Sequence, residues 1–146
     1  MKQALVFITL MLAVAGCSST QNPVSAGSGT LQYTLTTAKQ TYTAGDTLHF
    51  TLSAHNVGSA TDSVAIGDAI LVTWSLKNTS GAVMYSGQGP TGGLIGLLPV
   101  APGDTKVIDA WTHGLTDSSG TALPTGSYTF AVDYAGHPAS VDLAVH

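Results

Sequence analysis

A strict alternation of apolar and polar side chains over residues 48–55 is the feature that most constrains how this chain can fold. Leu48, Phe50, Leu52 and Ala54 are apolar, and the residues that follow them are His, Thr or Ser. Because successive side chains of a strand point to opposite faces, this pattern predicts a β-strand with one buried face.

Similar strand patterns recur along the chain, separated by turn signals rich in Gly, Asn, Asp and Pro. We expect further strands over residues 31–37, 70–76, 82–86, 105–112, 128–134 and 141–145, and a short edge strand around 64–66. Helical periodicity is missing after residue 17, and the residues that favour long exposed helices are scarce. The sequence therefore predicts an all-β fold, an antiparallel β-sandwich of about seven to eight strands.

Three stretches leave the strand pattern less defined. Thr105 to Thr112 carries apolar side chains at both parities, which either a β-bulge or burial on both sides would explain. Leu94 to Val100 is apolar, and we expect it to pack under or beside the sandwich. The segment Ala135 to Pro138 is expected to form the turn before the last strand.

Four residues are assigned structural roles, three of them because they match features of immunoglobulin-like domains. The segment that contains Gly126 and Tyr128 resembles a tyrosine corner, with Phe130 where antibody domains keep their second cysteine. Trp74 is the candidate for the buried Trp of the third strand, and Trp111 is the aromatic residue of the 105–112 strand. The predicted architecture is therefore immunoglobulin-like.

The N-terminus reads as an export signal followed by a lipidation site. Lys2 precedes an apolar run that is too short to span a bilayer, so residues 1–16 are predicted to be a signal peptide. The cleavage motif Val14, Ala15 and Gly16 before Cys17 resembles the bacterial lipobox, in which the cysteine carries a diacylglycerol. An ordinary secretory signal with an incidental cysteine is the alternative.

Lipidation would divide the chain into an anchor, a linker and a domain. Residues 17–29 are predicted to be the lipidated Cys and a flexible Ser- and Gly-rich linker, and residues 30–146 the sandwich domain. Lipid chains would hold the protein on a membrane of the cell envelope. Ser18 is not the Asp that retains lipoproteins at an inner membrane, so the outer membrane is favoured if the organism has two.

Composition and motifs argue against several classes of function. The chain has eight Asp, four Lys and neither Arg nor Glu, so we expect no nucleic-acid partner. The five His, which include His49 and His55 on one predicted strand, are too scattered to predict a metal site, and Asp62, Asp68 and Asp117 lack a calcium-loop pattern. No nucleophile motif or carboxylate pair is evident either, so we expect neither a cofactor nor an enzyme.

Binding is the remaining class, and the sequence offers two sites for it. The first is a Gly-rich segment that reads as a flexible recognition loop or as a mere connection: Gly87, Gln88, Gly89, Pro90, Thr91, Gly92 and Gly93. The second is an exposed aromatic patch of Tyr85, Trp111 and Tyr134, although these side chains would also suit a core. Pairing of a partner strand with a sheet edge is a further route, which Lys77 and Lys106 would discourage.

Four segments between about residues 40 and 134 together resemble the bacterial intracellular proteinase inhibitor (BsuPI-type) domain. They are Tyr42 to Asp46 with the strand that ends at Asn56; the Gly81 turn with Val83 and Tyr85; Pro102 to Asp104 leading to Trp111; and Asp117 to Gly120 leading to Gly126 and Tyr128. The resemblance implies an immunoglobulin-like fold and proteinase inhibition.

The expected function is that of a membrane-anchored, non-enzymatic envelope lipoprotein that binds or assembles with a protein partner. Proteinase inhibition of the BsuPI type is one alternative. A structural role as an accessory subunit of a surface complex is the other.

Overall fold

The computed structural model describes residues 24–25, 29–67, 72–89, 93 and 96–146. All regular elements in these ranges are β-strands, so the predicted all-β class is correct. The strands are β1 (Val24–Ser25), β2 (Leu31–Thr37), β3 (Thr41–Tyr42), β4 (Thr47–Asn56), β5 (Asp62–Ile66), β6 (Val72–Asn78), β7 (Val83–Gln88), β8 (Gly96–Val100), β9 (Thr105–Gly114), β10 (Gly126–Tyr134) and β11 (His137–Val145).

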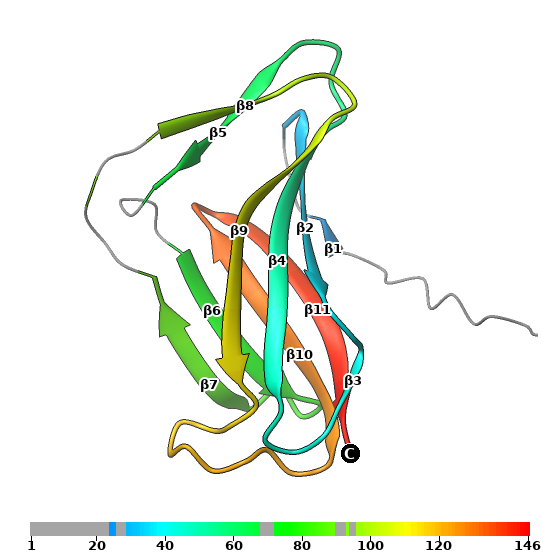
Figure 1. The fold of residues 1–146 in the computed structure, drawn as a ribbon, viewed down its shortest axis with the longest axis vertical. Helices are drawn as coiled ribbons and strands as arrows, with labels where there is room; N and C mark the ends of the chain where they lie inside the picture. Colours follow the sequence, from blue (N-terminus) through cyan, green and yellow to red (C-terminus); the bar gives the residue numbers. More distant parts are fainter. Residues whose placement is uncertain (1–23, 26–28, 68–71, 90–92, 94–95) are drawn as a thin grey trace, which may run out of the picture.

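Two sheets form a sandwich (Figure 1). The large sheet has the order β1-β11-β10-β6-β7, with β3 added in parallel to β11, and the three-stranded sheet has the order β2-β4-β9. The chain passes from one sheet to the other in the order typical of immunoglobulin-like domains. β4, β6 and β10 take the places of the second, third and sixth strands of those domains. The fold is therefore an immunoglobulin-like β-sandwich, with more short strands than the sequence predicts.

The core lies between the sheets and follows the predicted alternation. Leu48, Leu52 and Ala54 on β4 are fully buried. Phe50 packs against Phe130 of β10 with ring centroids 4.4 Å apart. Antibody domains join these two strands by a disulfide, so an aromatic pair here takes the place of that covalent link.

The corner before β10 has the hydrogen bond that the sequence predicts. The hydroxyl of Tyr128 donates to the carbonyl oxygen of Pro124 at 2.7 Å, which closes a tyrosine corner. Gly126 begins β10 beside the Tyr128 ring, at van der Waals distance for an added Cβ.

A separate ribbon of β5 and β8 lies beyond one end of the sandwich (Figure 1). The hydroxyl of Tyr134 donates to the carbonyl oxygen of Ala65 at 2.9 Å and so ties the ribbon to β10. The prediction that residues 94–100 pack under or beside the sandwich is wrong for Leu97, which is 71% exposed, and right for Val100, which is buried. Leu94 and Ile95 lie outside the described residues.

Asn56 joins the ribbon, the end of β4 and the turn before β9. Its buried side-chain amide donates to the carbonyl oxygens of Ala60 and Val100, both at 2.8 Å, and its side-chain oxygen accepts from the N–H of Gly58. Its backbone bonds to Gly103 and Asp104. Because every polar group of this buried residue is paired, Asn56 can stabilise three segments at once.

Several boundaries differ from the sequence prediction. Val24 and Ser25, within the predicted linker, pair with Ala139 and Ser140 of β11. The last strand begins at His137, because the turn needs only Ala135 and Gly136, both with positive φ. In β9 a bulge accounts for apolar side chains at both parities, because Ile108 has no partner in the register with β4.

Candidate functional site

The predicted recognition loop begins inside a strand. Gly87 and Gln88 are the last two residues of β7, where they pair with Trp74 and Thr73 of β6. Gly89 follows and still donates its N–H to the carbonyl oxygen of Val72 at 2.8 Å. The expectation of a loop is therefore wrong for Gly87 and Gln88. Pro90, Thr91 and Gly92 lie outside the described residues, and Gly93 is an isolated described position.

The Trp74 ring packs directly over Gly87. An added Cβ at Gly87 would lie 2.7 Å from Cε2 and Nε1 of Trp74, closer than side chains pack. Trp74 lies on the third strand of the immunoglobulin-like order and packs against the core, as the sequence predicts, but it is only partly buried. The reason is its place in the sheet, since β6 is next to the edge and its neighbour β7 offers a glycine there.

β7 is a free edge of the large sheet over part of its length. Within the described residues it pairs with β6 alone. Since Gly89 bonds to Val72, the alternation of antiparallel pairs puts Gly87 and Tyr85 in the hydrogen-bonded pairs with β6. The backbone N–H and C=O groups of Ser86 and Gln88 therefore point away from the sheet.

The loop after β9 covers the beginning of that edge. The N–H of Ser118 donates to the carbonyl oxygen of Met84 at 3.1 Å. Asp117 fixes this loop, because its Oδ1 accepts from the N–H groups of Ser119 and Thr121 and from the Ser119 hydroxyl. These bonds, that of the Ser119 hydroxyl first, lower the pKa of Asp117. The open part of the edge is thus limited to Ser86 and Gln88.

The edge strand of the three-stranded sheet, β9, has a different surface. Lys106 and Asp109 pair with the buried residues Ala54 and Leu52, so the register puts both on the core side of β9, where the Lys106 side chain is still 45% exposed. Lys106 also approaches Asp104 at 3.8 Å, and Ile108 bulges between the two charged positions. Inward charges and bulges are features that discourage strand pairing at an edge.

The other outer strands of the two sandwich sheets have neighbours. The outer side of β11 is occupied by β1 near one end and β3 near the other. β2, at the far side of the three-stranded sheet, lies against β1 and β11. Among the described strands of these two sheets, β7 and β9 are therefore the edges that bear on partner binding.

The three aromatic residues of the predicted patch do not form one exposed surface. Tyr134 is buried, and burial, followed by the charge of Asp109, raises its pKa to about 12. Trp111 is partly buried and packs against Phe50 at 5.3 Å between ring centroids. Tyr85 packs against His113 at 4.0 Å, which joins β7 to β9 across the sandwich. Tyr85 and Tyr134 thus link separate sheets and Trp111 packs within the three-stranded sheet, so the three rings do not form one exposed surface.

His113 is the most perturbed histidine. Its Nε2 is buried without a hydrogen-bond partner in the described part of the chain, and burial lowers its pKa below the ordinary 6.5. The Nδ1 of His55 lies 3.1 Å from the carbonyl oxygen of Asp104 and 3.0 Å from the Thr105 hydroxyl. Within the described residues, no three His, Cys, Asp or Glu side chains are grouped closely enough to hold a metal ion.

The predicted anchor lies outside the described residues, which include neither Val14, Ala15 and Gly16 nor Cys17. Among the residues that are described, none forms a helix long and apolar enough to cross a membrane.

Comparison with models of known protein families found no match, and comparison with curated proteins found none either. Solved structures with a similar fold include a β-glucosidase from Erythrobacter marinus, with 13% identity and a TM-score of 0.45 over 80% of this chain and 15% of that chain. A DNA-bound alkylpurine DNA glycosylase from Pseudomonas fluorescens has 10% identity and a TM-score of 0.49, over 80% of this chain and 30% of that one.

A third similar structure is the CARDB domain of a Pyrococcus furiosus protein. Its identity is 12% and its TM-score 0.42, over 80% of this chain and 87% of that chain. This chain thus spans less than a third of the glucosidase and the glycosylase but most of the CARDB domain. At these identities the likeness is one of fold alone.

Proposed function

We propose that this protein is a membrane-anchored, non-enzymatic module of the bacterial envelope that assembles with a protein partner through the open edge of β7. The observation that supports the proposal is the outward backbone of Ser86 and Gln88 on a strand without charge or Pro. Edge strands of this kind bind extended segments by adding a strand to the sheet. The partner is therefore expected to contribute a β-strand.

Anchoring rests on the lipobox before Cys17. Lipid chains on Cys17 would hold the protein at a membrane, with the outer membrane favoured in an organism that has two. Cys17→Ser should release the protein from the membrane fraction, and labelled fatty acid should enter only the wild type. A membrane-bound variant together with an unlabelled wild type would contradict the anchor.

Partner binding is tested by a photo-crosslinking amino acid placed in the full chain in intact cells. At Gln88, which is exposed on β7, we expect a covalent adduct with another protein or with a second copy. The matched position is Val107, which is 59% exposed on β9 and should give no adduct. Equal adducts at both positions, or none at Gln88, would contradict the proposal.

Backbone pairing is separated from side-chain contact by two substitutions at one residue. Ser86→Pro removes an outward N–H and should abolish the adduct at Gln88. Ser86→Ala keeps that N–H and should leave the adduct unchanged. Loss of the adduct with both variants would point to side-chain recognition and against strand pairing.

Proteinase inhibition remains the second candidate, and it rests on the resemblance to the BsuPI-type domain. Titration of the full protein against serine proteases tests it directly, since an inhibitor would lower their activity in proportion to its concentration. Unchanged protease activity at micromolar concentration would exclude it. A third candidate is a structural accessory subunit of a surface complex, which the same crosslinking would identify through its partner.

A further inference from the structure

The outer face of the large sheet is a lattice of small polar side chains. Residues paired across neighbouring strands lie side by side on one face, so the register defines the rows of this lattice. The rows are Thr41, Ala144 and Ser127; Asp142, Thr129 and Lys77; Ser140, Ala131, Ser75 and Ser86; and Pro138, Asp133, Thr73 and Gln88. Of these residues, only Gln88 and Lys77 have long side chains, and Gln40, next to Thr41, adds a third at the border of the lattice.

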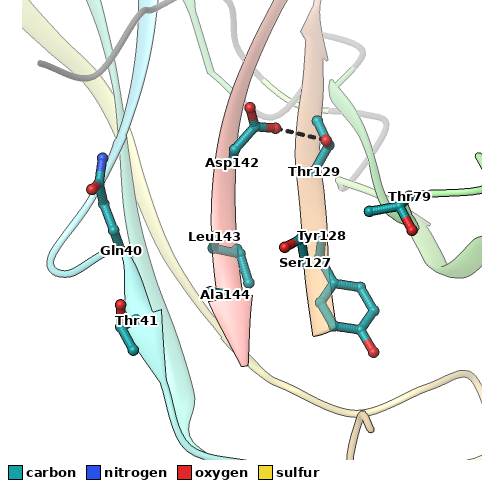
Figure 2. Close-up of a pocket in the computed structure, with 9 residues that line it drawn as sticks. All are labelled: Gln40, Thr41, Thr79, Ser127, Tyr128, Thr129, Asp142, Leu143 and Ala144. Carbon is teal, nitrogen blue, oxygen red and sulfur yellow. Dashed lines mark hydrogen bonds between the residues drawn. The ribbon is translucent and has the colours of Figure 1, made fainter. Parts of the chain in front are cut away.

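One end of this face is a hollow of about 520 Å³ (Figure 2). The outer surfaces of β10 and β11 form its floor, with Gln40 and Thr41 on one side and Thr79 on the other (Figure 2). Across the floor the Thr129 hydroxyl donates to Oδ1 of Asp142 at 2.7 Å. The hollow thus presents hydroxyl, amide and carboxylate groups, which together donate and accept hydrogen bonds.

A second hollow of about 520 Å³ lies on the same face, toward the other end of β10. Its polar lining includes Ser75, Ser86, Gln88 and Asp133. Both hollows therefore present the same groups: one carboxylate, one amide and several small hydroxyl side chains. Thr129 and Asp133 are four positions apart on β10, which is about 13 Å along a strand.

Charge and backbone pairing narrow the class of ligand. Each hollow has one Asp, the chain has no Arg, and Lys77 is the single basic side chain in the lattice, so a polyanion would be repelled. β10 pairs with β6 and β11 along its length, so its backbone offers a peptide nothing to bond. The hydroxyl, amide and carboxylate side chains that line both hollows match a ligand that offers many hydroxyl groups at short spacing.

We propose that this face binds a neutral polysaccharide chain, with the two hollows as successive subsites along β10. Sugar hydroxyls donate to Asp142 and Asp133 and accept from the Gln and Thr side chains. Hollows of this volume have the size of small-molecule sites, and a chain that occupies both would bind more tightly than one that occupies either. The first hollow uses no residue of β7, whereas the second is lined in part by Ser86 and Gln88 of β7, so variants in the first hollow test sugar binding apart from pairing at β7.

The test uses the full protein in a detergent without a sugar headgroup, with maltohexaose, cellohexaose and chitohexaose as probes at millimolar concentration. At least one probe should shift the NMR amide signals of Ser127, Thr129, Ala131 and Asp133. If all three leave these signals unchanged, or shift only signals elsewhere, the proposal is wrong.

Two variants and a control locate the site. Asp142→Ala and Thr129→Val should each weaken binding about tenfold, because each removes a hydrogen-bonding group in the first hollow. Thr51→Val, on the outer face of the three-stranded sheet, should not change it. Thermal unfolding of each variant shows that it is folded, and equal weakening by Thr51→Val would overturn the assignment.

Discussion

The two edge strands β7 and β9 close the same side of the sandwich, yet they treat a potential partner differently. β9 places Lys106 and Asp109 on its core-facing side and bulges at Ile108. β7 has no charged residue, and its backbone is open at Ser86 and Gln88. The contrast indicates that one edge is protected from pairing and the other is left available for it.

The two edge strands also differ in the turns that precede them and hold them in place. β9 is tied through its preceding turn to buried Asn56, whereas β7 follows a turn held by the partly exposed Asn78. β7 also depends on a glycine under the Trp74 ring. The open edge is therefore also the more weakly supported one, which is common for segments that bind.

The largest effect is expected where β9 is anchored. Asn56→Leu leaves the carbonyl oxygens of Ala60 and Val100 and the N–H of Gly58 without their partners, so unfolding free energy should fall by about 3–5 kcal/mol. Urea denaturation measures this loss.

The matched variant is at the turn before β7. Asn78→Ala removes an oxygen that accepts from the N–H groups of Ser80 and Ala82 in an exposed turn, and should cost about 1 kcal/mol. Equal losses for the two variants would remove the difference in support between the edges.

A glycine on each edge gives the next comparison. Gly87→Ala pushes a Cβ to 2.7 Å from the Trp74 ring and should cost about 1–3 kcal/mol. Gly114→Ala, at the end of β9, meets only Thr116 atoms at 3.9 Å and should change stability by less than about 0.5 kcal/mol. Thermal unfolding of the pair tests this, and a tolerated Gly87→Ala would show that the ring can move.

The tyrosine corner involves neither β7 nor β9. A variant there is therefore a control for loss of stability that is not specific to an edge. Tyr128→Phe removes the 2.7 Å hydrogen bond to Pro124 and should cost about 1 kcal/mol in urea denaturation. Crosslinking at Gln88 should persist in this variant, because β7 is untouched. If the adduct disappeared, its loss in Ser86→Pro could no longer be assigned to the edge.

The smallest effect concerns pH and the contact between the edges. Burial keeps the pKa of His113 below 6.5 in the folded protein, so the unfolded chain binds more protons as pH falls. His113 should therefore cost no stability above about pH 6.5 and an increasing amount below it. Urea denaturation from about pH 8 to pH 5 measures the loss, which His113→Phe should reduce and His49→Gln, at an exposed site, should not. An unchanged loss in His113→Phe would assign it to another group.

The periodic strands were predictable because side-chain alternation records which face is buried. The alternation over residues 48–55 predicts the buried face of β4, and the segment around Tyr128 predicts the tyrosine corner. Gly87 and Gln88 were misread because glycine usually signals a loop, and only the structure places the Trp74 ring over Gly87. The sequence contains no local sign of that contact, since it depends on the register between β6 and β7.

The open edge at β7 is only partly predictable from the sequence. Lys106 is correctly predicted to be a charge at an edge, whereas the lack of charge in residues 83–88 has meaning only once β7 is known to be an edge. Lys77, identified for the same reason, instead lies on β6, which is flanked by β7 and β10 and is not an edge. Strand order decides which residues are at an edge, and it follows from contacts between segments far apart in the chain.

Hydrogen exchange tests the central claim most directly. Amide exchange of the β7 and β9 segments is measured by mass spectrometry in the full protein, once purified and once in intact envelopes. If a partner strand pairs with β7, exchange of residues 83–88 slows in envelopes while that of residues 105–114 stays the same. Equal exchange of residues 83–88 in both states, or slowing confined to β9, would contradict the account.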